Sequence, residues 1–576
     1  MMKDILLLKQ NRTLMLFSVL MCWVITVTSN LIGTWTDPFL SFLLPLFDCY
    51  LLCVLATILQ NARMGYVVGC LVVAILFAEL FTVFFYHSNF TIYVILLILE
   101  TNTAESTEFI HTALTHPGTW YAVATTGLTG LVAWWLAHLS RKMLLAGKVR
   151  YRRMLAFVVF VLIAWSGIRQ LSAYYKLLRC FTSVSTTVCN DVHYIPHLNT
   201  PFVRLAYGAA YNMASSAELD VLEATVAATT VDSCSYRCPL IVLVIGESFN
   251  KHHTPLYEKD YLPTTPLLMQ QQEKGNLVIY TNAVAPFNFT SNAFKYMFST
   301  WDETSNDEWT AHSLFPAVFK KAGYCVDFFT NQFAMARAED MWDFAGGTIF
   351  NHHRLSDLQF TNRNPDIYEF DGELLDELPP VDSLTAKPTL LIVHLRGQHV
   401  SYDRRYPKEF SRFSPDEEKT LFGGKIGREM AAHYDNATLY NDYVVHTVFD
   451  RLKASDAIGI FLSDHGEEVY DWRDKYERTN ERTITPEIAR YQYEIPFMFY
   501  MTDTFKLRHS DVAEAVTTAV DRPFISSDLC HLLFYLGGIG FVDYQEKRNI
   551  LSPCYDKNRK RIIDFEVDYD ALMKTL

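Results

Sequence analysis

Long apolar runs dominate the first third of the chain. Each run holds about 20 residues with few charged side chains, and a helix of that length crosses a hydrocarbon core of about 30 Å. The pattern predicts five membrane-spanning helices, at about residues 13–34, 39–59, 65–86, 119–139 and 154–174. Asp48 and Glu79 fall inside the second and third of these spans. Charges at that depth are costly, so we expect the two carboxyl groups to be neutral or paired between helices.

Basic residues are distributed unevenly around these spans. Lys and Arg precede the first span, occur between the second and third, and number six in the segment SRKMLLAGKVRYRR between the fourth and fifth. The opposite loops, 35–38 and 87–118, contain none. Because positively charged loops stay in the cytoplasm, the N-terminus is predicted to be cytoplasmic. Everything after about residue 175 is then predicted to lie outside the cytoplasm.

The pattern changes beyond residue 238. Short apolar runs end abruptly in glycine and polar residues, and longer amphipathic stretches such as 311–322 and 436–453 separate them. Such runs are typical of buried parallel strands that lie between helices. The predicted strands are 239–248, 324–332, 388–399 and 458–466. They indicate an α/β domain with a mostly parallel central sheet.

These patterns divide the chain into three parts. We expect a transmembrane domain of five helices at 1–175, a connector with a bridging helix at 176–237, and an α/β domain at 238–576. The formal net charge of −13 argues against nucleic acid as a partner, because such a partner requires a basic face. The lipid bilayer is the partner that the first domain predicts.

The cysteines are compatible with this topology. Seven of the eleven lie beyond the predicted spans, and an oxidising compartment would allow them to form disulfides. The close pairs Cys180/Cys189 and Cys234/Cys238 are the candidates. A zinc site at Cys234 and Cys238 is a weaker alternative, because no second pair of ligands lies nearby.

Polar residues with possible chemistry follow three of the predicted strands. Glu247 follows the first, His399 the third, and Asp464 with His465 the fourth. Ligands of open α/β sheets gather at the carboxyl ends of strands. Glu247, Asp464 and His465 would offer two carboxylates and one imidazole, a set that suits zinc or another divalent ion. The alternative for Asp464 and His465 alone is a polar turn with a surface histidine.

A hydroxyl in the segment NAVAPFNFTSNAFKYMFST, residues 282–300, could react at such a metal. Thr290 or Ser291 would lie near the start of a helix, where free N–H groups favour a phosphate. A metal-bound hydroxyl loses its proton more easily and becomes a competent nucleophile. The alternative is that Thr290 only caps the helix.

Taken together, these motifs resemble those of one enzyme family. LVIGES at 243–248, NFT at 288–290, HLRGQHVSYDRRYP at 394–407 and FLSDHGEE at 461–468 are similar, in wording and order, to motifs of the phosphoethanolamine transferases of Gram-negative bacteria. The resemblance covers nearly the whole chain. It implies a multi-pass enzyme of the inner membrane whose periplasmic catalytic domain is of the alkaline phosphatase/sulfatase type.

In that family a threonine takes phosphoethanolamine from phosphatidylethanolamine and passes it to lipopolysaccharide, so the resemblance implies both lipids as partners. It also implies one tightly bound zinc ion. The zinc ligands carried over are Glu247, Thr290, Asp464 and His465, and Thr290 is also the nucleophile. The other residues carried over are His399 for the phosphoryl group or a second metal, Asn331 and Gln332 on the floor of the active site, and Asn102 and Glu105 in a loop facing the lipid donor.

One departure concerns the second metal and the acceptor. Members that modify lipid A carry a further histidine shortly after SDHGE, whereas the stretch EVYDWRDKYERT at 468–479 has none. This leaves a second zinc open and brings the match closer to the branch that modifies core heptose. The resemblance therefore leaves the acceptor open between core sugar and lipid A.

Two other functions are compatible with the sequence. One is a phosphoglycerol transferase or another sulfatase-like membrane phosphotransferase or hydrolase, since lipoteichoic acid synthases also combine five spans with a threonine nucleophile. A sulfatase itself would need a Cys or Ser in a C/S-x-P-x-R context, which is absent around Thr290. The other is a non-catalytic membrane protein with a degenerate fold, against which the intact set of candidate ligands argues.

Overall fold

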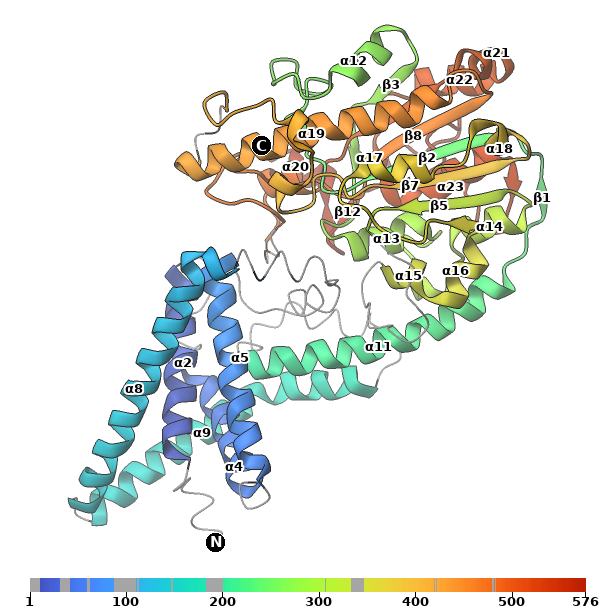
Figure 1. Cartoon of the computed structure of the whole chain (residues 1–576). Coiled ribbons are helices and arrows are strands. Elements are labelled where there is room, and N and C mark those ends of the chain that lie inside the picture. Colours follow the sequence, from blue (N-terminus) through green and yellow to red (C-terminus); the bar gives the residue numbers. More distant parts are fainter. Residues whose placement is uncertain are drawn as a thin grey trace. The chain divides into compact units, whose positions relative to one another are not determined.

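The apolar runs of the first third form helices in the computed structural model (Figure 1). The helices are α2 (Arg12–Leu31), α4 (Pro45–Leu59), α5 (Met64–Tyr86), α8 (Pro117–Ala146) and α9 (Val149–Thr182). Segments 64–85, 117–140 and 156–182 are, within the described part of the chain, long and apolar enough to cross a membrane. The apolar stretches of α2 and α4 are shorter, so a count of five spans stays a prediction.

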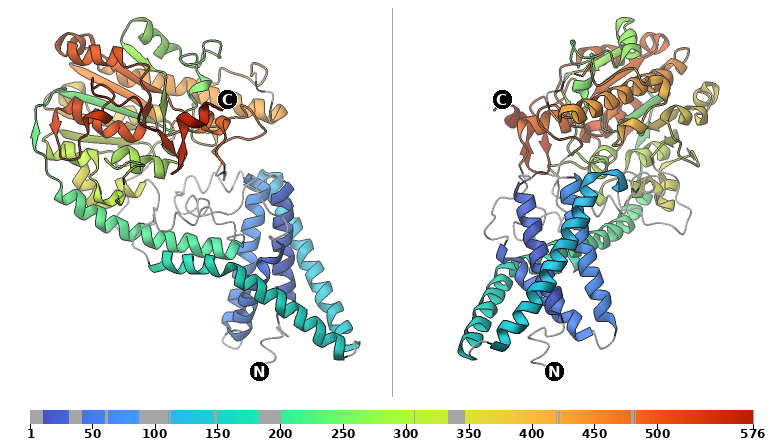
Figure 2. Two further views of the ribbon diagram at one scale, coloured as in Figure 1. Left: turned by 180° about the vertical axis from the view of Figure 1, so that it is seen from behind. Right: turned by 60° about the vertical axis from the view of Figure 1, so that its left-hand side comes forward.

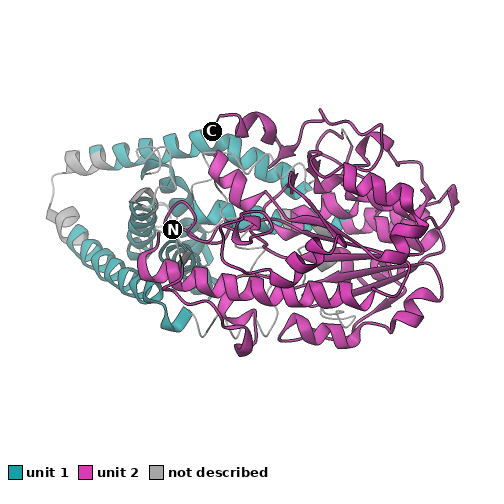
Figure 3. Ribbon diagram, turned by 90° about the horizontal axis from the view of Figure 1, so that it is seen from above, with its two compact units in different colours: residues 1–218 teal, residues 219–576 magenta. Residues whose placement is uncertain are grey.

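The structure describes residues 11–31, 42–59, 63–86, 110, 113–146, 149–182, 200–305, 307–332, 347–418, 420, 422–478, 481 and 483–575. They belong to two units, residues 1–218 and 219–576 (Figure 3). Helix α11 (Pro201–Ala228) begins in the first unit and ends in the second.

Both acidic residues inside the apolar helices of the first unit have partners. The Asp48 carboxylate accepts a hydrogen bond from Tyr174 of α9. The Glu79 carboxylate forms an ion pair with Arg204 of α11, and both side chains are almost inaccessible to solvent. The structure therefore shows each of the two carboxyl groups paired with a residue of another helix.

A seven-stranded mixed sheet forms the centre of the second unit. Its strands, in spatial order, are β3 (Leu277–Tyr280), β9 (Phe497–Met501), β8 (Ala457–Ser463), β2 (Leu240–Gly246), β7 (Thr389–His394), β5 (Cys325–Thr330) and β6 (Asn362–Arg363). Strand β9 is antiparallel to both of its neighbours, and the other pairs are parallel. The predicted mostly parallel sheet is confirmed.

Helices cover both faces of this sheet (Figure 1, Figure 2). Successive side chains of a strand point to opposite faces, and β2 accordingly contributes to two separate cores. Val242 and Val244 pack in the core that contains Val444 of α19 (Gly424–Arg451). Leu243 packs in the core that includes Phe294 of α13 (Thr290–Phe298). Burial on both faces explains why this strand is apolar throughout.

Shorter elements complete the second unit. The further helices are α12 (Pro266–Glu273), α14 (Phe315–Lys321), α15 (Gly347–Asn351), α16 (His353–Gln359), α17 (Asp371–Leu374), α18 (Val381–Thr385), α20 (Pro486–Gln492), α21 (Asp503–Arg508), α22 (Ser510–Thr518), α23 (Leu529–Gly537), α24 (Tyr569–Met573) and the 3-10 helix η2 (Lys251–His253). The small strand pairs are β1 (Ser233–Cys234) with β11 (Ile539–Gly540), β4 (Ala283–Val284) with β10 (Phe524–Ile525), and β12 (Ile562–Ile563) with β13 (Val567–Asp568).

The structure tests one of the two predicted cysteine pairs. Cys180 is disulfide-bonded, and its predicted partner Cys189 lies outside the described residues. Cys234 and Cys238 are both free thiols. The predicted bridge between Cys234 and Cys238 is therefore wrong, and Cys238 instead lies buried in an apolar core.

Candidate metal centre

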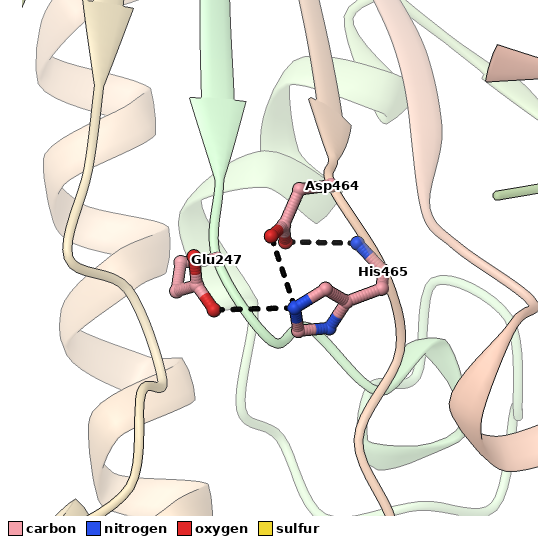
Figure 4. Close-up of side chains that lie close together, drawn as sticks. All are labelled: Glu247, Asp464 and His465. Atoms are coloured by element: carbon pink, nitrogen blue, oxygen red, sulfur yellow. Dashed lines mark hydrogen bonds and ion pairs between the residues drawn. The ribbon is translucent and has the colours of Figure 1, made fainter. Parts of the chain in front are cut away.

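Two adjacent parallel strands bring the predicted acidic ligands together. Gly246, the last residue of β2, pairs with Ser463, the last residue of β8. The residues that follow, Glu247 on one strand and Asp464 with His465 on the other, therefore leave the sheet side by side (Figure 4). All three side chains are fully buried, and a ligand atom from each lies within 4.8 Å of those of the others.

Hydrogen bonds fix the orientation of this cluster. Asp464 Oδ1 accepts hydrogen bonds from the backbone N–H groups of Ser248, at 3.1 Å, and His465, at 2.8 Å. The His465 Nδ1–H donates to Gly466 O at 2.8 Å. The other ring nitrogen, Nε2, therefore faces Asp464 Oδ2 at 3.0 Å and Glu247 Oε1 at 3.4 Å. A metal-binding histidine is held in the same way, through its second nitrogen.

The electrostatics of the cluster favour a bound cation. Burial lowers the pKa of His465, but the Asp464 charge and the hydrogen bonds to both carboxylates raise it to about 9. Burial by itself would raise the pKa of Glu247, yet its hydrogen bond to His465 and the charges of His465 and Arg478 hold it well below its ordinary value. The field that attracts a proton to His465 Nε2 attracts a metal ion equally, and the metal would displace that proton.

One oxygen of the cluster has an unused acceptor site. Asp464 Oδ2 is buried, and the described residues offer it only the ion pair with His465 Nε2 at 3.0 Å. Such an oxygen is costly in a dry interior unless a cation lies against it. With two carboxylates, one imidazole and a nearby hydroxyl, the donor set fits a divalent metal with an open coordination position.

Thr290 lies at this cluster as the first residue of α13. The residue at the N-cap is Phe289, and no side chain caps the helix. The Thr290 hydroxyl instead donates to Glu247 Oε2 at 3.2 Å, and its Oγ1 lies 3.3 Å from His465 Nε2. The alternative that Thr290 only caps the helix is therefore wrong. Its side chain is partly exposed, so a reacting group can approach the hydroxyl.

The two residues that follow β5 have different environments. Gln332 Nε2 donates to Glu247 Oε2 at 3.1 Å and to Leu395 O at 2.7 Å, so its side chain supports a candidate ligand directly. Asn331 is fully buried, and its amide group binds Asp371 and the backbone of Tyr368. This geometry gives Asn331 a role in holding the neighbouring loop. Direct contact of either residue with a substrate stays a prediction.

The loop that carries His399 passes very close to Glu247. Gly397 in this loop has a φ of 50°, and a Cβ added there would lie 2.7 Å from Glu247 O. Asp371 holds the loop by accepting hydrogen bonds from the N–H groups of Arg396 and Gly397. Burial lowers the pKa of His399 to about 3, so its imidazole is neutral at pH 7. A neutral imidazole there can donate or accept a hydrogen bond.

Sequence reasoning missed one cation at the cluster. Arg478 Nη1 lies 2.7 Å from His465 Nε2, and it donates to Ser248 Oγ at 2.9 Å and to Glu247 Oε1 at 3.1 Å. Its Nε lies 3.7 Å from Oε2 of the buried Glu467. Arg478 belongs to no recognised sequence motif. It lies in the stretch 468–479, whose notable feature in the sequence is the lack of histidine. The predicted residues Asn102 and Glu105 lie outside the described residues.

Residues 239–539, just over half of the chain, match the family described as Sulfatase. The phosphoethanolamine transferase EptC of Escherichia coli O18:K1:H7 (strain RS218 / NMEC) is 29% identical over 345 residues. That match covers 58% of this chain and 57% of the relative, so the shared sequence spans little more than half of either protein.

Two solved structures share the fold. The zinc complex of the C-terminal periplasmic domain of EcEptC from Escherichia coli is 26% identical, with a TM-score of 0.50 over 58% of this chain and 93% of that chain. The integral membrane protein lipooligosaccharide phosphoethanolamine transferase A (EptA) from Neisseria meningitidis is 19% identical, with a TM-score of 0.62. Its match covers 94% of this chain and 98% of that chain, so the likeness of fold extends to the apolar helices.

Proposed function

Since the chain belongs to the sulfatase family, we propose that it is a metal-dependent phosphoethanolamine transferase. It transfers phosphoethanolamine from phosphatidylethanolamine to lipopolysaccharide through a covalent intermediate on Thr290. The observation that carries this proposal is the position of Thr290. Its hydroxyl lies against Glu247 and His465, and the residue is the first of helix α13. The names of the relatives support the phosphoethanolamine chemistry.

Zinc is the metal that we propose. Glu247, Thr290, Asp464 and His465 would hold it, and the related E. coli domain was crystallised with zinc. A bound zinc ion would supply Lewis acidity, which eases deprotonation of the Thr290 hydroxyl and offsets charge on the phosphoryl group. The donor set leaves room for a reacting group at such a site.

The residues of the chain then position two successive displacements. In the first, Thr290 Oγ1 forms a bond to phosphorus and the bond from phosphorus to the diacylglycerol oxygen breaks. The proton that Thr290 loses is matched by the proton that diacylglycerol gains. In the second, a hydroxyl or phosphate of the acceptor attacks the same phosphorus and Thr290 leaves. Both steps depend mainly on positioning and on stabilisation of charge on the phosphoryl oxygens.

Two groups near Thr290 suit this task. The N-terminus of α13 presents backbone N–H groups that have no partner within the helix and favour an anion. His399, neutral at pH 7, would bind a phosphoryl oxygen through a ring N–H. Its low pKa favours this role over protonation of a leaving alkoxide.

The apolar helices fit a reaction between two lipids. We propose that they hold the enzyme in the inner membrane of a Gram-negative bacterium, with the N-terminus in the cytoplasm and residues from about 175 onward in the periplasm. Donor and acceptor would then reach the enzyme within or beside one bilayer. Between core heptose and lipid A, the stretch 468–479 without histidine favours the core sugar as acceptor.

The variant Thr290→Ala tests this function. In membranes supplied with labelled phosphatidylethanolamine, we expect wild type to yield a phosphoethanolamine-modified peptide that contains Thr290, and the alanine variant to yield none. Thr290→Ser keeps the hydroxyl and is expected to retain part of the transfer. Transfer by the alanine variant would disprove the threonine intermediate. Label taken from phosphatidylglycerol instead would favour a phosphoglycerol transferase.

Mass spectrometry of lipopolysaccharide tests the acceptor. Cells that produce the wild-type chain are expected to gain one phosphoethanolamine group that cells producing Thr290→Ala lack. Fragmentation then maps the group to core sugar or to lipid A. Lipopolysaccharide of unchanged mass, in cells that form the threonine intermediate, would mean that the acceptor is another molecule.

A further inference from the structure

We propose that Arg478 binds a non-bridging phosphoryl oxygen of the substrate and of the threonine intermediate, and provides the positive charge that a second metal ion would otherwise provide. The site then works with one zinc ion. This inference rests on the proposed function for its substrate, although binding of any phosphoryl group would test it.

The geometry places the guanidinium next to the reacting hydroxyl. Glu247 Oε1 lies 3.1 Å from Arg478 Nη1 and 3.4 Å from Thr290 Oγ1. His465 Nε2 lies 2.7 Å from the same nitrogen and 3.3 Å from the same hydroxyl oxygen. The hydroxyl and the guanidinium therefore share two neighbouring atoms. A phosphoryl group attached to Thr290 would have an oxygen within reach of Arg478.

The charge of this side chain suits that role. A guanidinium stays charged at any physiological pH and presents several N–H donors in a planar fork that matches phosphate. Among the described residues that contact Glu247, Asp464 or His465, Arg478 is the cation. His399 is the other candidate for binding a phosphoryl oxygen, and its burial keeps it neutral.

The surrounding structure holds Arg478 in place. Its side chain is 9% exposed, and the preceding residue, Glu477, has a φ of 65°, which is uncommon for a residue other than glycine. The guanidinium carbon lies 5.9 Å from the centre of the aromatic ring of Phe289, the residue that precedes Thr290. Such backbone strain persists where the surroundings fix it and is frequent at active sites.

A guanidinium at this position leaves less need for a second divalent ion, because it already provides positive charge beside the reacting hydroxyl. Its charge is balanced by the carboxylates of Glu247 and Glu467. The resulting site would combine one zinc ion with one fixed guanidinium, which matches the absence of a further histidine from residues 468–479.

Three variants of the full-length protein test the inference. Arg478→Gln removes the charge, Arg478→Lys keeps the charge without the fork, and Arg473→Gln is the matched control. Arg473 lies in the same loop and is also ion-paired, but its partners are Glu468 and Glu481 rather than the cluster. Zinc per chain is measured by elemental analysis, and binding of phosphoethanolamine and of inorganic phosphate by calorimetry. Kinetics give kcat and KM separately.

We expect wild type, Arg478→Gln and Arg473→Gln each to hold one zinc per chain. Arg478→Gln is expected to bind phosphoethanolamine and phosphate about tenfold to a hundredfold more weakly, as loss of a charge-assisted hydrogen bond implies. Arg478→Lys should recover part of this binding, and Arg473→Gln should match wild type. In the kinetics, Arg478→Gln should lower both kcat/KM and kcat.

Three outcomes would overturn the inference. They are two zinc ions per chain in wild type, unchanged phosphate binding by Arg478→Gln, and loss of zinc from Arg478→Gln while Arg473→Gln keeps it. The last would show that Arg478 supports the metal ligands and does not bind the phosphoryl group. Failure of wild type to transfer phosphoethanolamine would disprove the proposed function, whereas phosphate binding would still test Arg478.

Discussion

At the scale of single residues, three positive φ angles occur next to the candidate metal centre. Ser248, Gly397 and Glu477 have φ values of 56°, 50° and 65°. For a residue other than glycine this conformation costs about 1–3 kcal/mol and persists only where contacts enforce it. At Ser248 the contacts are visible, since its hydroxyl binds Glu247 Oε1 and its N–H binds Asp464 Oδ1. The strained residue therefore ties together the two candidate carboxylate ligands.

Gly397→Ala is expected to weaken zinc binding as well as stability. The added Cβ would lie 2.7 Å from Glu247 O and 2.9 Å from Glu247 N, so the backbone of a candidate ligand would have to move. Gly275→Ala is the matched control, because Gly275 has a φ of 72° but no heavy atom within 4 Å of its added Cβ. That control is expected to lose only about 1–2 kcal/mol of stability, which is the cost of the left-handed conformation for alanine.

Thermal unfolding and zinc titration of both glycine variants check this prediction. We expect both to be less stable than wild type and only Gly397→Ala to bind zinc more weakly. The same zinc affinity in the two variants would show that the contact with Glu247 does not control the metal site.

The sequence was sufficient to predict some site residues and insufficient for others. Glu247, Asp464 and His465 each follow an apolar run, and parallel strands end at one edge of a sheet, so their convergence could be expected. Thr290 was ambiguous, because a threonine at a helix start caps helices more often than it reacts. Arg478 could not be predicted, since the direction of a loop side chain depends on the positive φ of Glu477 and on tertiary contacts.

At the scale of elements, a buried histidine joins three segments that are distant in the sequence. His253 of η2 lies with Nδ1 at 2.7 Å from Asp435 Oδ1 of α19 and with Nε2 at 3.1 Å from Asp471 Oδ1. Tyr261 OH lies 2.7 Å from the same Nδ1. Asp471 belongs to the loop that continues to Arg478. The network therefore links this loop to a long helix that packs on the sheet.

The network predicts that the stability of the folded protein falls as pH rises. Burial lowers the pKa of His253, but Asp435 and Asp471 raise it to about 10, from an ordinary value of 6.5. The folded protein thus keeps a proton that the unfolded chain releases, so the stabilisation is complete below pH 6.5 and is lost as pH rises towards 10. Burial also raises the pKa of Glu418 to about 8, which acts in the same direction.

Thermal unfolding of wild type and His253→Gln as a function of pH checks this prediction. We expect the decline between about pH 6.5 and 10 to be smaller in the variant. His446→Gln is the control, because burial lowers the pKa of His446 and its removal should not reduce the decline. An equal decline in wild type and His253→Gln would mean that other groups cause it.

The elements themselves were predicted unevenly. The four strands placed from the sequence all formed, because residues buried on both faces of a sheet are apolar without interruption. The predicted helix at 311–322 is shorter in the structure, since α14 begins at Phe315 with a proline in its first turn. The predicted helix at 436–453 is longer, and α19 begins at Gly424. Glycines in its first turns concealed that start.

At the scale of the whole molecule, the chain combines a unit with little charge and a charged α/β unit. Apolar side chains such as Trp134 of α8 and Phe157 and Phe160 of α9 are exposed on the first unit, as a surface in contact with lipid requires. Within that unit, Glu79 of α5 pairs with Arg204 of α11. Arg204 lies in the part of α11 that belongs to the first unit, so this ion pair ties the start of α11 to α5 within that unit.

A double-mutant cycle tests whether the pair stabilises the first unit. Arg204→Met removes the cation of this pair, and Glu79→Met removes the anion. Each is expected to destabilise the detergent-solubilised protein by about 3–5 kcal/mol, because each removes one partner of a buried ion pair. The double variant is expected to be close to wild type, since a buried ion pair can be replaced by apolar side chains at little cost. Arg169→Met, at an exposed position of α9, is the control and should change stability little. A double variant as unstable as the two single variants combined would show that the residues act independently, and the start of α11 would then be held by packing alone.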